Sequence, residues 1–254
     1  MINRELPPEG LIETQEHEPK FIGRITLLRH GQTEYTDVYP DLTEEGQETV
    51  RRSAEQIAKN LREEEEVLLM SSDKARAQGT AGIVKDVLGY KGNIRTVKGI
   101  TGLEMRNREK GMEIINEMLA DGGVPSVDYA YTHDPRFDDA EIFEPRDEIQ
   151  KRFMTNIEYA IRAFKTVAKH EELPKPHLIA VTHFEVLSPF LHQIFDIKHP
   201  EDPTFKNAET VEISVIDPSA ENENSDLVFL EVSFRDHIKT IGFDRINRRL
   251  INTE

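Results

Sequence analysis

Short apolar runs alternate with longer amphipathic stretches along most of the chain. The apolar runs are rich in β-branched residues, have the length of strands, and cover residues 22–29, 67–71, 94–97 and 177–182. Stretches with apolar residues at helical spacing lie between and after them, over residues 43–61, 75–88, 146–169 and 185–195. Thr43 is the expected N-cap of the first helix. Such alternation is typical of a mainly parallel sheet with helices on both faces. The pattern therefore predicts an α/β fold, a three-layer α/β/α sandwich.

Other segments depart from this alternation. Residues 1–20 are rich in proline and glutamate without any period, which predicts a flexible N-terminal arm before a single domain over residues 21–254. Residues 104–145 contain a double glycine, three prolines and several aromatic residues, and we interpret them as a cap inserted over the edge of the sheet. Two apolar runs, 211–216 and 227–234, predict an antiparallel strand pair. The acidic run 63–66 is expected to be the solvated end of the first helix.

Composition narrows the class of protein. The chain has 32 Lys and Arg against 48 Asp and Glu, a formal net charge of −16. So acidic a surface repels phosphate backbones, which argues against nucleic acid or an anionic membrane as the main partner. The absence of cysteine excludes disulfides, thiolate catalysis and cysteine-ligated metals. No apolar run approaches the roughly 20 residues of a membrane span, and the first residues lack the apolar core of a signal peptide. We expect a cytoplasmic protein.

Basic side chains follow three of the predicted strands. Arg29 and His30 end the first strand, Arg76 lies shortly after the second, and His183 follows the fourth. Because ligands of open α/β sheets bind at the carboxyl ends of the strands, these groups are expected to converge on one rim. A guanidinium fork matches the oxygens of phosphate, so the rim predicts a phosphate pocket. In a chain without cysteine, imidazole is the strongest nucleophile for such a pocket.

Four segments resemble the histidine phosphatase superfamily, in its phosphoglycerate-mutase-like branch. They are LLRHGQT, DLTEEGQETV, SSDKARAQGTA and VTHFEVL, and they occur in the order and at the spacing of that family. The resemblance implies a phosphoglycerate-mutase-like fold and a two-step phosphoryl transfer through a phosphohistidine on His30. It implies that Arg29, Arg76 and His183 bind the phosphoryl oxygens. It also places Gln32 and Thr33 in the phosphate site and calls for no metal and no cofactor.

The same resemblance requires a general acid for the leaving oxygen. In this branch a glutamate after the third strand has that role, and Glu104 is the nearest match, although Arg108 stands where the family has a glycine. Glu109 is a second candidate, and Glu185 is a third because more distant branches place the acid beside the second histidine. Phe184 also replaces a frequent glycine, and Thr36 stands where mutases commonly carry asparagine.

The resulting hypothesis is a metal-independent phosphomonoester hydrolase that acts on a small phosphorylated substrate. One alternative is a phosphoglycerate-type mutase, which returns the phosphoryl group to a second hydroxyl and needs a cap that keeps water out. Another is a non-catalytic module that binds a phosphate ligand and has lost the acid. Specificity resides in the cap, where local patterns are weakest, so neither the substrate nor the oligomeric state follows from the sequence.

Overall fold

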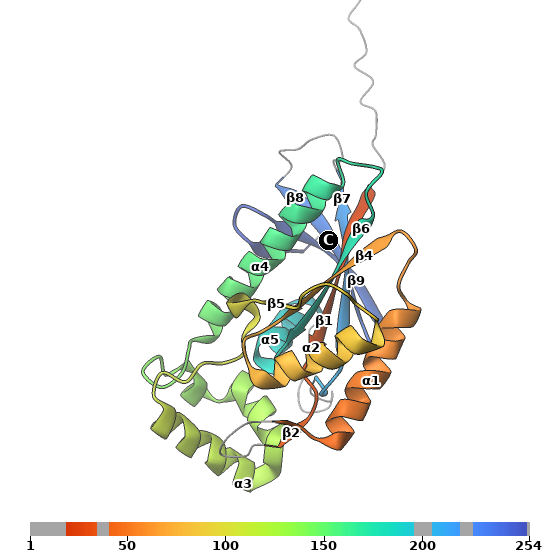
Figure 1. Ribbon diagram of the computed structural model, residues 1–254. Coiled ribbons are helices and arrows are strands. Elements are labelled where there is room, and N and C mark those ends of the chain that lie inside the picture. Colours follow the sequence, from red (N-terminus) through yellow and green to blue (C-terminus); the bar gives the residue numbers. More distant parts are fainter. Residues whose placement is uncertain (1–18, 35–40, 196–204, 219–225, 253–254) are drawn as a thin grey trace, which may run out of the picture.

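The structure is a computed structural model that describes residues 19–34, 41–195, 205–218 and 226–252. All but the last two residues of the predicted arm lie outside these ranges, and so does Thr36. Within the described residues the chain forms one eight-stranded sheet with the strand order β10-β9-β8-β7-β1-β6-β4-β5. The mixed α/β class predicted from the alternation is confirmed (Figure 1).

Only half of this sheet is parallel, which corrects the predicted, mainly parallel arrangement. The parallel half contains β1 (Lys20–Arg29), β6 (Lys175–Thr182), β4 (Glu65–Ser71) and β5 (Arg95–Thr96). The antiparallel half contains β7 (Thr210–Asp217), β8 (Leu227–Phe234), β9 (His237–Asp244) and β10 (Arg249–Ile251). The pair β7 and β8 was expected, whereas β9 and β10 were not. The first four residues of β9 are all exposed, so this strand lacks the alternation that marks a half-buried strand.

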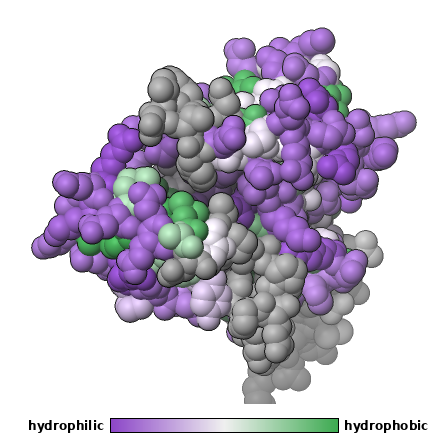
Figure 2. Space-filling view, turned by 90° about the horizontal axis from the view of Figure 1, so that it is seen from below, coloured by the Kyte–Doolittle hydropathy of each residue, from purple (hydrophilic) through white to green (hydrophobic). Residues whose placement is uncertain are grey.

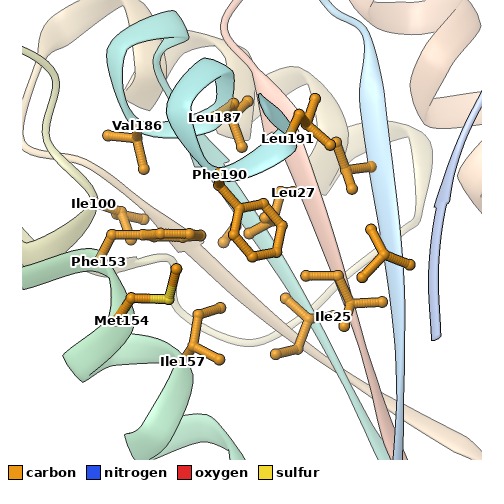
Figure 3. Close-up of a cluster of buried hydrophobic side chains, with 14 of the residues drawn as sticks. Ile25, Leu27, Ile100, Phe153, Met154, Ile157, Val186, Leu187, Phe190 and Leu191 are labelled. Carbon is orange, nitrogen blue, oxygen red and sulfur yellow. The ribbon is translucent and has the colours of Figure 1, made fainter. Parts of the chain in front are cut away.

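Helices cover both faces of the sheet, as the alternation predicts. On one face, α1 (Glu44–Lys59) and α2 (Ala75–Val87) bury a core that includes Leu28, Val50 and Ala81. On the other face, α4 (Arg146–Val167) and α5 (Phe184–Phe195) bury a larger core. Figure 3 shows part of that larger core, where Ile25 and Leu27 of β1 meet aromatic rings from both helices.

The first helix starts where the sequence predicts but ends earlier. Thr43 accepts a hydrogen bond from the amide of Gly46, so it is the N-cap. The helix ends at Lys59, and the acidic run continues into β4 instead of closing the helix. Glu65 is fully buried, where it accepts from Arg24 and lies 3.4 Å from Nδ1 of His177. The prediction of a solvated acidic run is therefore wrong for Glu65, because a buried cation compensates its charge.

Residues 104–145, the predicted cap, form a helical layer at the end of the sheet where β1, β4 and β6 finish (Figure 1). The layer consists mainly of α3 (Arg108–His133) and the short 3-10 helix η2 (Pro135–Asp138). A bridge between Met105 and Phe143 ties its two ends together. α3 is broken at Gly122 and Gly123, and Gly123 has φ +70°, a conformation that favours glycine.

The surface at this end of the molecule is mostly hydrophilic. Figure 2 views it from below and shows small hydrophobic areas mainly on the side where α3 lies. The exposed Met112 and Tyr129 belong to that helix. Among the described helices, none combines the length and the apolar character that crossing a bilayer requires.

Candidate active site

Three neighbouring parallel strands deliver the predicted basic residues to one edge of the sheet. β6 lies between β1 and β4, so the residues that follow these strands are neighbours in space. His30 follows β1 and His183 follows β6, and the two imidazole rings lie 5.0 Å apart between centroids at an interplanar angle of 57°. Both histidines are buried. Arg76 donates to His30, and the charges of Arg29 and Arg76 act on both rings; we call this cluster of four residues the anion hollow.

The hydrogen bonds of His30 fix its tautomer. Nδ1 lies 2.8 Å from the carbonyl oxygen of Gly31, and Nε of Arg76 donates to Nε2 over 2.9 Å. A carbonyl only accepts and a guanidinium only donates, so Nδ1 carries the hydrogen and Nε2 keeps its lone pair. Burial, Arg76 and Arg29 together hold the pKa of His30 well below its ordinary value. At neutral pH His30 is thus an uncharged imidazole with a nucleophilic Nε2.

His183 has the opposite orientation. Its Nε2 lies 2.6 Å from the hydroxyl oxygen of Ser72, which also accepts from the amide of Lys74 at 3.3 Å. A serine hydroxyl donates one hydrogen bond and can accept two, so Ser72 pairs with Nε2 in either tautomer of His183 and leaves Nδ1 for another partner. That Nδ1 is buried and has no hydrogen-bond partner among the described residues. Burial and Arg76 are the main causes that lower the pKa of His183.

Arg29 is held by groups from three separate parts of the chain. One terminal nitrogen donates to Asp128 of α3 over 2.9 Å and also to the carbonyl oxygen of Phe205. The other terminal nitrogen lies 3.5 Å from the second oxygen of Asp128, and the guanidinium stacks 5.0 Å above the ring of Phe184. Within the described structure only Nε, which is buried, has no hydrogen-bond partner. The structure thus brings Arg29 to the anion hollow with most of its donors already in use.

The segment that leads into β7 supports the same loop through its main chain. The amide of Arg29 donates to the carbonyl oxygen of Glu209, and the amide of Ala208 donates to the carbonyl oxygen of Arg29. The side chain of Asn207 donates to the carbonyl oxygen of His30 over 3.1 Å. These bonds fix the backbone from which both predicted site residues project.

The structure places Gln32 and Thr33 in the loop after His30. Gln32 has an exposed side chain, and its carbonyl oxygen accepts from the amide of Thr43 over 3.0 Å. Thr33 belongs to β2 (Thr33–Glu34), which pairs with β3 (Asp41–Leu42). Gly46 approaches this loop so closely that a Cβ atom there would lie 2.3 Å from the Gln32 carbonyl oxygen. The loop is therefore held against the start of α1.

The three candidate acids occupy different environments. Glu104 and Glu109 have exposed side chains, and the carbonyl oxygen of Glu104 accepts from the amide of Glu144. Glu185 lies beside His183 in the first turn of α5. A Cβ atom on Gly102 would lie 2.8 Å from Cγ of His183 and 2.9 Å from Oε2 of Glu185. The structure thus brings Glu185 beside His183 and places Glu104 and Glu109 on the surface.

Sequence reasoning missed two side chains that touch the predicted ones. Ser72 directly follows β4 at the same edge of the sheet, and this position is the signal that could have identified it. Asp128 has no such signal, because it lies in a helix of the cap without clear amphipathic spacing. Burial raises the pKa of Asp128 to about 6, although Arg29 acts in the opposite direction.

The described residues include no group of three or more histidines and carboxylates placed to hold a metal ion. Asp134 and Asp138, which surround His133 in the sequence, form ion pairs with Arg136 and Arg146. These arginines compensate the acidic groups of the cap.

Comparison with known proteins agrees with this fold. Residues 25–229 match the histidine phosphatase superfamily (branch 1). The chain therefore belongs to this superfamily, and its fold is that of the phosphoglycerate-mutase-like structures. No curated protein matches the sequence.

Among solved structures, a mycobacterial glucosyl-3-phosphoglycerate phosphatase in its native form has a TM-score of 0.58 at 18% identity, with 84% of this chain and 97% of that chain covered. The complex of that phosphatase with inorganic phosphate also has a TM-score of 0.58, at 19% identity, with 85% and 97% covered. A structure titled mycobacterial hydrolase 2 has a TM-score of 0.58 at 18% identity, with 85% and 91% covered. At these identities the likeness concerns the fold.

Proposed function

We propose that the protein is a metal-independent phosphomonoester hydrolase that forms a phosphohistidine on His30. The observation that carries this proposal is a buried pair of imidazoles, His30 and His183, whose ring centroids lie 5.0 Å apart, with Arg76 bonded to His30. Nε2 of His30 has a lone pair for attack, whereas Nδ1 of His183 and Nε of Arg29 are buried and have no hydrogen-bond partner in the described part of the chain; we assign both as donors. Buried donors without acceptors are costly unless a ligand satisfies them, and the oxygens of a phosphoryl group would do so.

In the first step Nε2 of His30 attacks phosphorus in line, and the bond from phosphorus to the ester oxygen breaks. Arg76, which donates to Nε2, transfers its hydrogen bond to a phosphoryl oxygen as the new bond forms. His183 and Arg29 supply the other donors for the charge that develops on the oxygens. In the second step water attacks phosphorus, the bond to Nε2 breaks, and inorganic phosphate leaves.

The departing ester oxygen must receive a proton. Glu185 has its carboxylate beside His183, and we assign it the role of general acid in the first step and general base in the second. Glu104, the match by resemblance, is the alternative donor, and Gln32 and Thr33 remain assigned to substrate binding.

The substrate is a small phosphorylated molecule of the cytoplasm. Positive groups in the hollow favour a phosphate dianion, while the net charge of −16 disfavours nucleic acids and anionic membranes as main partners. Two of the similar structures bear the name glucosyl-3-phosphoglycerate phosphatase, which makes phosphorylated sugar derivatives the first substrates to test.

Trapping of the intermediate tests this function. A substrate labelled in the phosphoryl group is mixed with the full chain, and the reaction is quenched in alkali, because phosphohistidine is stable to base and labile to acid. We expect label on the wild-type protein and none on His30→Ala, together with steady release of inorganic phosphate in the presence of a chelator. Label that is absent from the wild type while phosphate is released would contradict the mechanism.

The same experiment separates the alternative functions. A mutase would transfer the label to an added phosphoglycerate in preference to water. A phosphate-binding module would bind tungstate, an analogue of the phosphate dianion, without turnover of any ester.

A further inference from the structure

A buried carboxylate from the cap pairs with Arg29, one of the four residues of the anion hollow. The side chain of Asp128 is only 11% exposed, and both of its oxygens face the guanidinium of Arg29, at 2.9 and 3.5 Å. Asp128 is not among the residues predicted to bind phosphate, and the proposed mechanism gives it no role. A negative charge next to a phosphate site opposes the binding of a dianion, so its presence there requires an explanation.

The charged groups that face Asp128 come from two other elements. Arg29 at the end of β1 favours the ionised carboxylate, whereas Glu185 of α5 and burial favour the protonated form. The last two effects prevail and raise the pKa of Asp128 to about 6. His30 and His183 are neutral, because burial lowers the pKa of each. Asp128 is thus mostly ionised at neutral pH, and a small further rise in its pKa would protonate it.

A dianion that binds between Arg29 and His183 acts on Asp128 as Glu185 does. It places negative charge near the carboxylate in a buried site, where charges are poorly screened, and it competes for the same guanidinium. Both effects favour transfer of a proton from solvent to the carboxylate. The protonated carboxyl group still accepts a hydrogen bond from Arg29, so the guanidinium keeps its position.

Resting on the proposed function, we infer that Asp128 is the counter-anion of Arg29 when no ligand is bound and takes up one proton when a phosphate dianion enters the anion hollow. The carboxylate gains the proton from water or buffer and returns it when inorganic phosphate leaves. Affinity for the dianion is therefore lower than the basic residues alone would provide. Asp128 in this way limits inhibition by the product and makes affinity depend on pH.

Calorimetric titration with tungstate tests the inference on the full chain without any need for turnover. Measurement in two buffers of different ionisation enthalpy gives the number of protons taken up with the anion. We expect close to one proton for the wild type near neutral pH. Asp128→Asn should bind tungstate on the order of ten-fold more tightly and with much less proton uptake, because the asparagine keeps the hydrogen bond and removes the charge.

A matched control removes the same charge elsewhere on the cap. Asp134 is partly exposed and pairs with Arg136, and no hydrogen bond or ion pair joins it to the residues of the anion hollow, so Asp134→Asn should bind tungstate as the wild type does. The wild type alone gives a second measurement that requires no stable variant. Its affinity for tungstate should fall as pH rises from about 6 to about 8, by up to ten-fold per pH unit for one coupled proton.

Three outcomes would overturn the inference while leaving the proposed function intact. The first is weaker binding by Asp128→Asn, which would make the carboxylate a support for Arg29. The second is unchanged proton uptake in that variant, which would assign the proton to the histidines. The third is tungstate affinity that does not vary with pH in the wild type. A wild-type protein that does not bind tungstate at all would overturn both the inference and the proposed function.

Discussion

The hydroxyl oxygen of Ser72 lies 2.6 Å from Nε2 of His183, and this contact decides which nitrogen of the imidazole faces the anion hollow. Both residues follow adjacent parallel strands, so their contact is a direct result of the register between β4 and β6. The orientation of His183 therefore depends on a residue that makes no contact with substrate in the proposed mechanism.

Ser72→Ala should lower kcat by about ten-fold, since loss of one hydrogen bond to a buried imidazole costs roughly 1.5 kcal/mol. Steady-state hydrolysis of an aryl phosphate measures the effect. Ser71→Ala is the matched control, because the Ser71 hydroxyl is also buried but donates to the carbonyl oxygen of Ser72. Equal losses of kcat in the two variants would show that the contact with His183 has no special role.

Gly102→Ala should reduce activity by at least about ten-fold. The new Cβ would lie under 3 Å from both His183 and Glu185, a separation that forces one of them to move. Gly82→Ala in α2 is the opposite case, because nothing lies within 4 Å of its new Cβ. That variant should keep full activity and raise the free energy of unfolding by up to about 1 kcal/mol, as measured by urea denaturation.

Substrates with leaving groups of different basicity can show whether Glu185 or Glu104 is the general acid. Glu185→Gln should slow hydrolysis of an alkyl phosphate by at least about a hundred-fold while affecting nitrophenyl phosphate little, because nitrophenolate leaves without a proton. Glu104→Gln should affect both substrates slightly. The reverse pattern would assign the acid to Glu104, in line with the family resemblance, and would withdraw that role from Glu185.

Acid should destabilise the protein through buried histidines. Burial, Arg24 and Arg62 lower the pKa of His177 from 6.5 to about 3, so below 6.5 the unfolded chain binds a proton that the folded chain does not. The free energy of unfolding therefore falls as pH drops from 6.5 towards 3, by about 1.4 kcal/mol per pH unit for this residue. His30 and His183 contribute in the same direction.

His177→Gln removes one group that takes up a proton when the protein unfolds in acid. Urea denaturation of the wild type and the variant at several pH values should give a shallower loss of stability for the variant. At neutral pH the variant should itself be less stable, by roughly 1–3 kcal/mol, because Thr26 donates to or accepts from His177 at 2.8 Å in the buried core. Identical slopes would mean that His177 is protonated in the folded state.

The parallel half of the fold could be predicted because its strands carry a local signal. Buried strands such as β1 and β6 are nearly continuous apolar runs, and the turns after them end in glycine or polar residues. β9 could not be predicted in the same way, since residues 237–240 are exposed and do not alternate. Its position depends on pairing with β8, which is a tertiary interaction. The same is true of Glu65, whose burial depends on the distant Arg24.

The anion hollow was predictable only in part, for a similar reason. Strand ends locate His30, Arg29 and His183 because the rule for parallel sheets turns sequence position into spatial position. No comparable rule connects Asp128 to Arg29, which lie 99 residues apart and meet only when the cap folds over the sheet. The three candidate acids could not be separated from the sequence, because only the tertiary structure shows that Glu185 lies beside His183.

The mixed direction of the sheet affects how this protein tolerates change in sequence. Because β7 runs against β1, the start of β7 and the chain before it stand beside His30. There the amide of Ala208 donates to the carbonyl oxygen of Arg29, and the carbonyl oxygen of Glu209 accepts from the amide of Arg29. Insertion or deletion of a single residue among 205–209 would shift these main-chain bonds, together with the bond from Asn207 to His30, and would displace both Arg29 and His30.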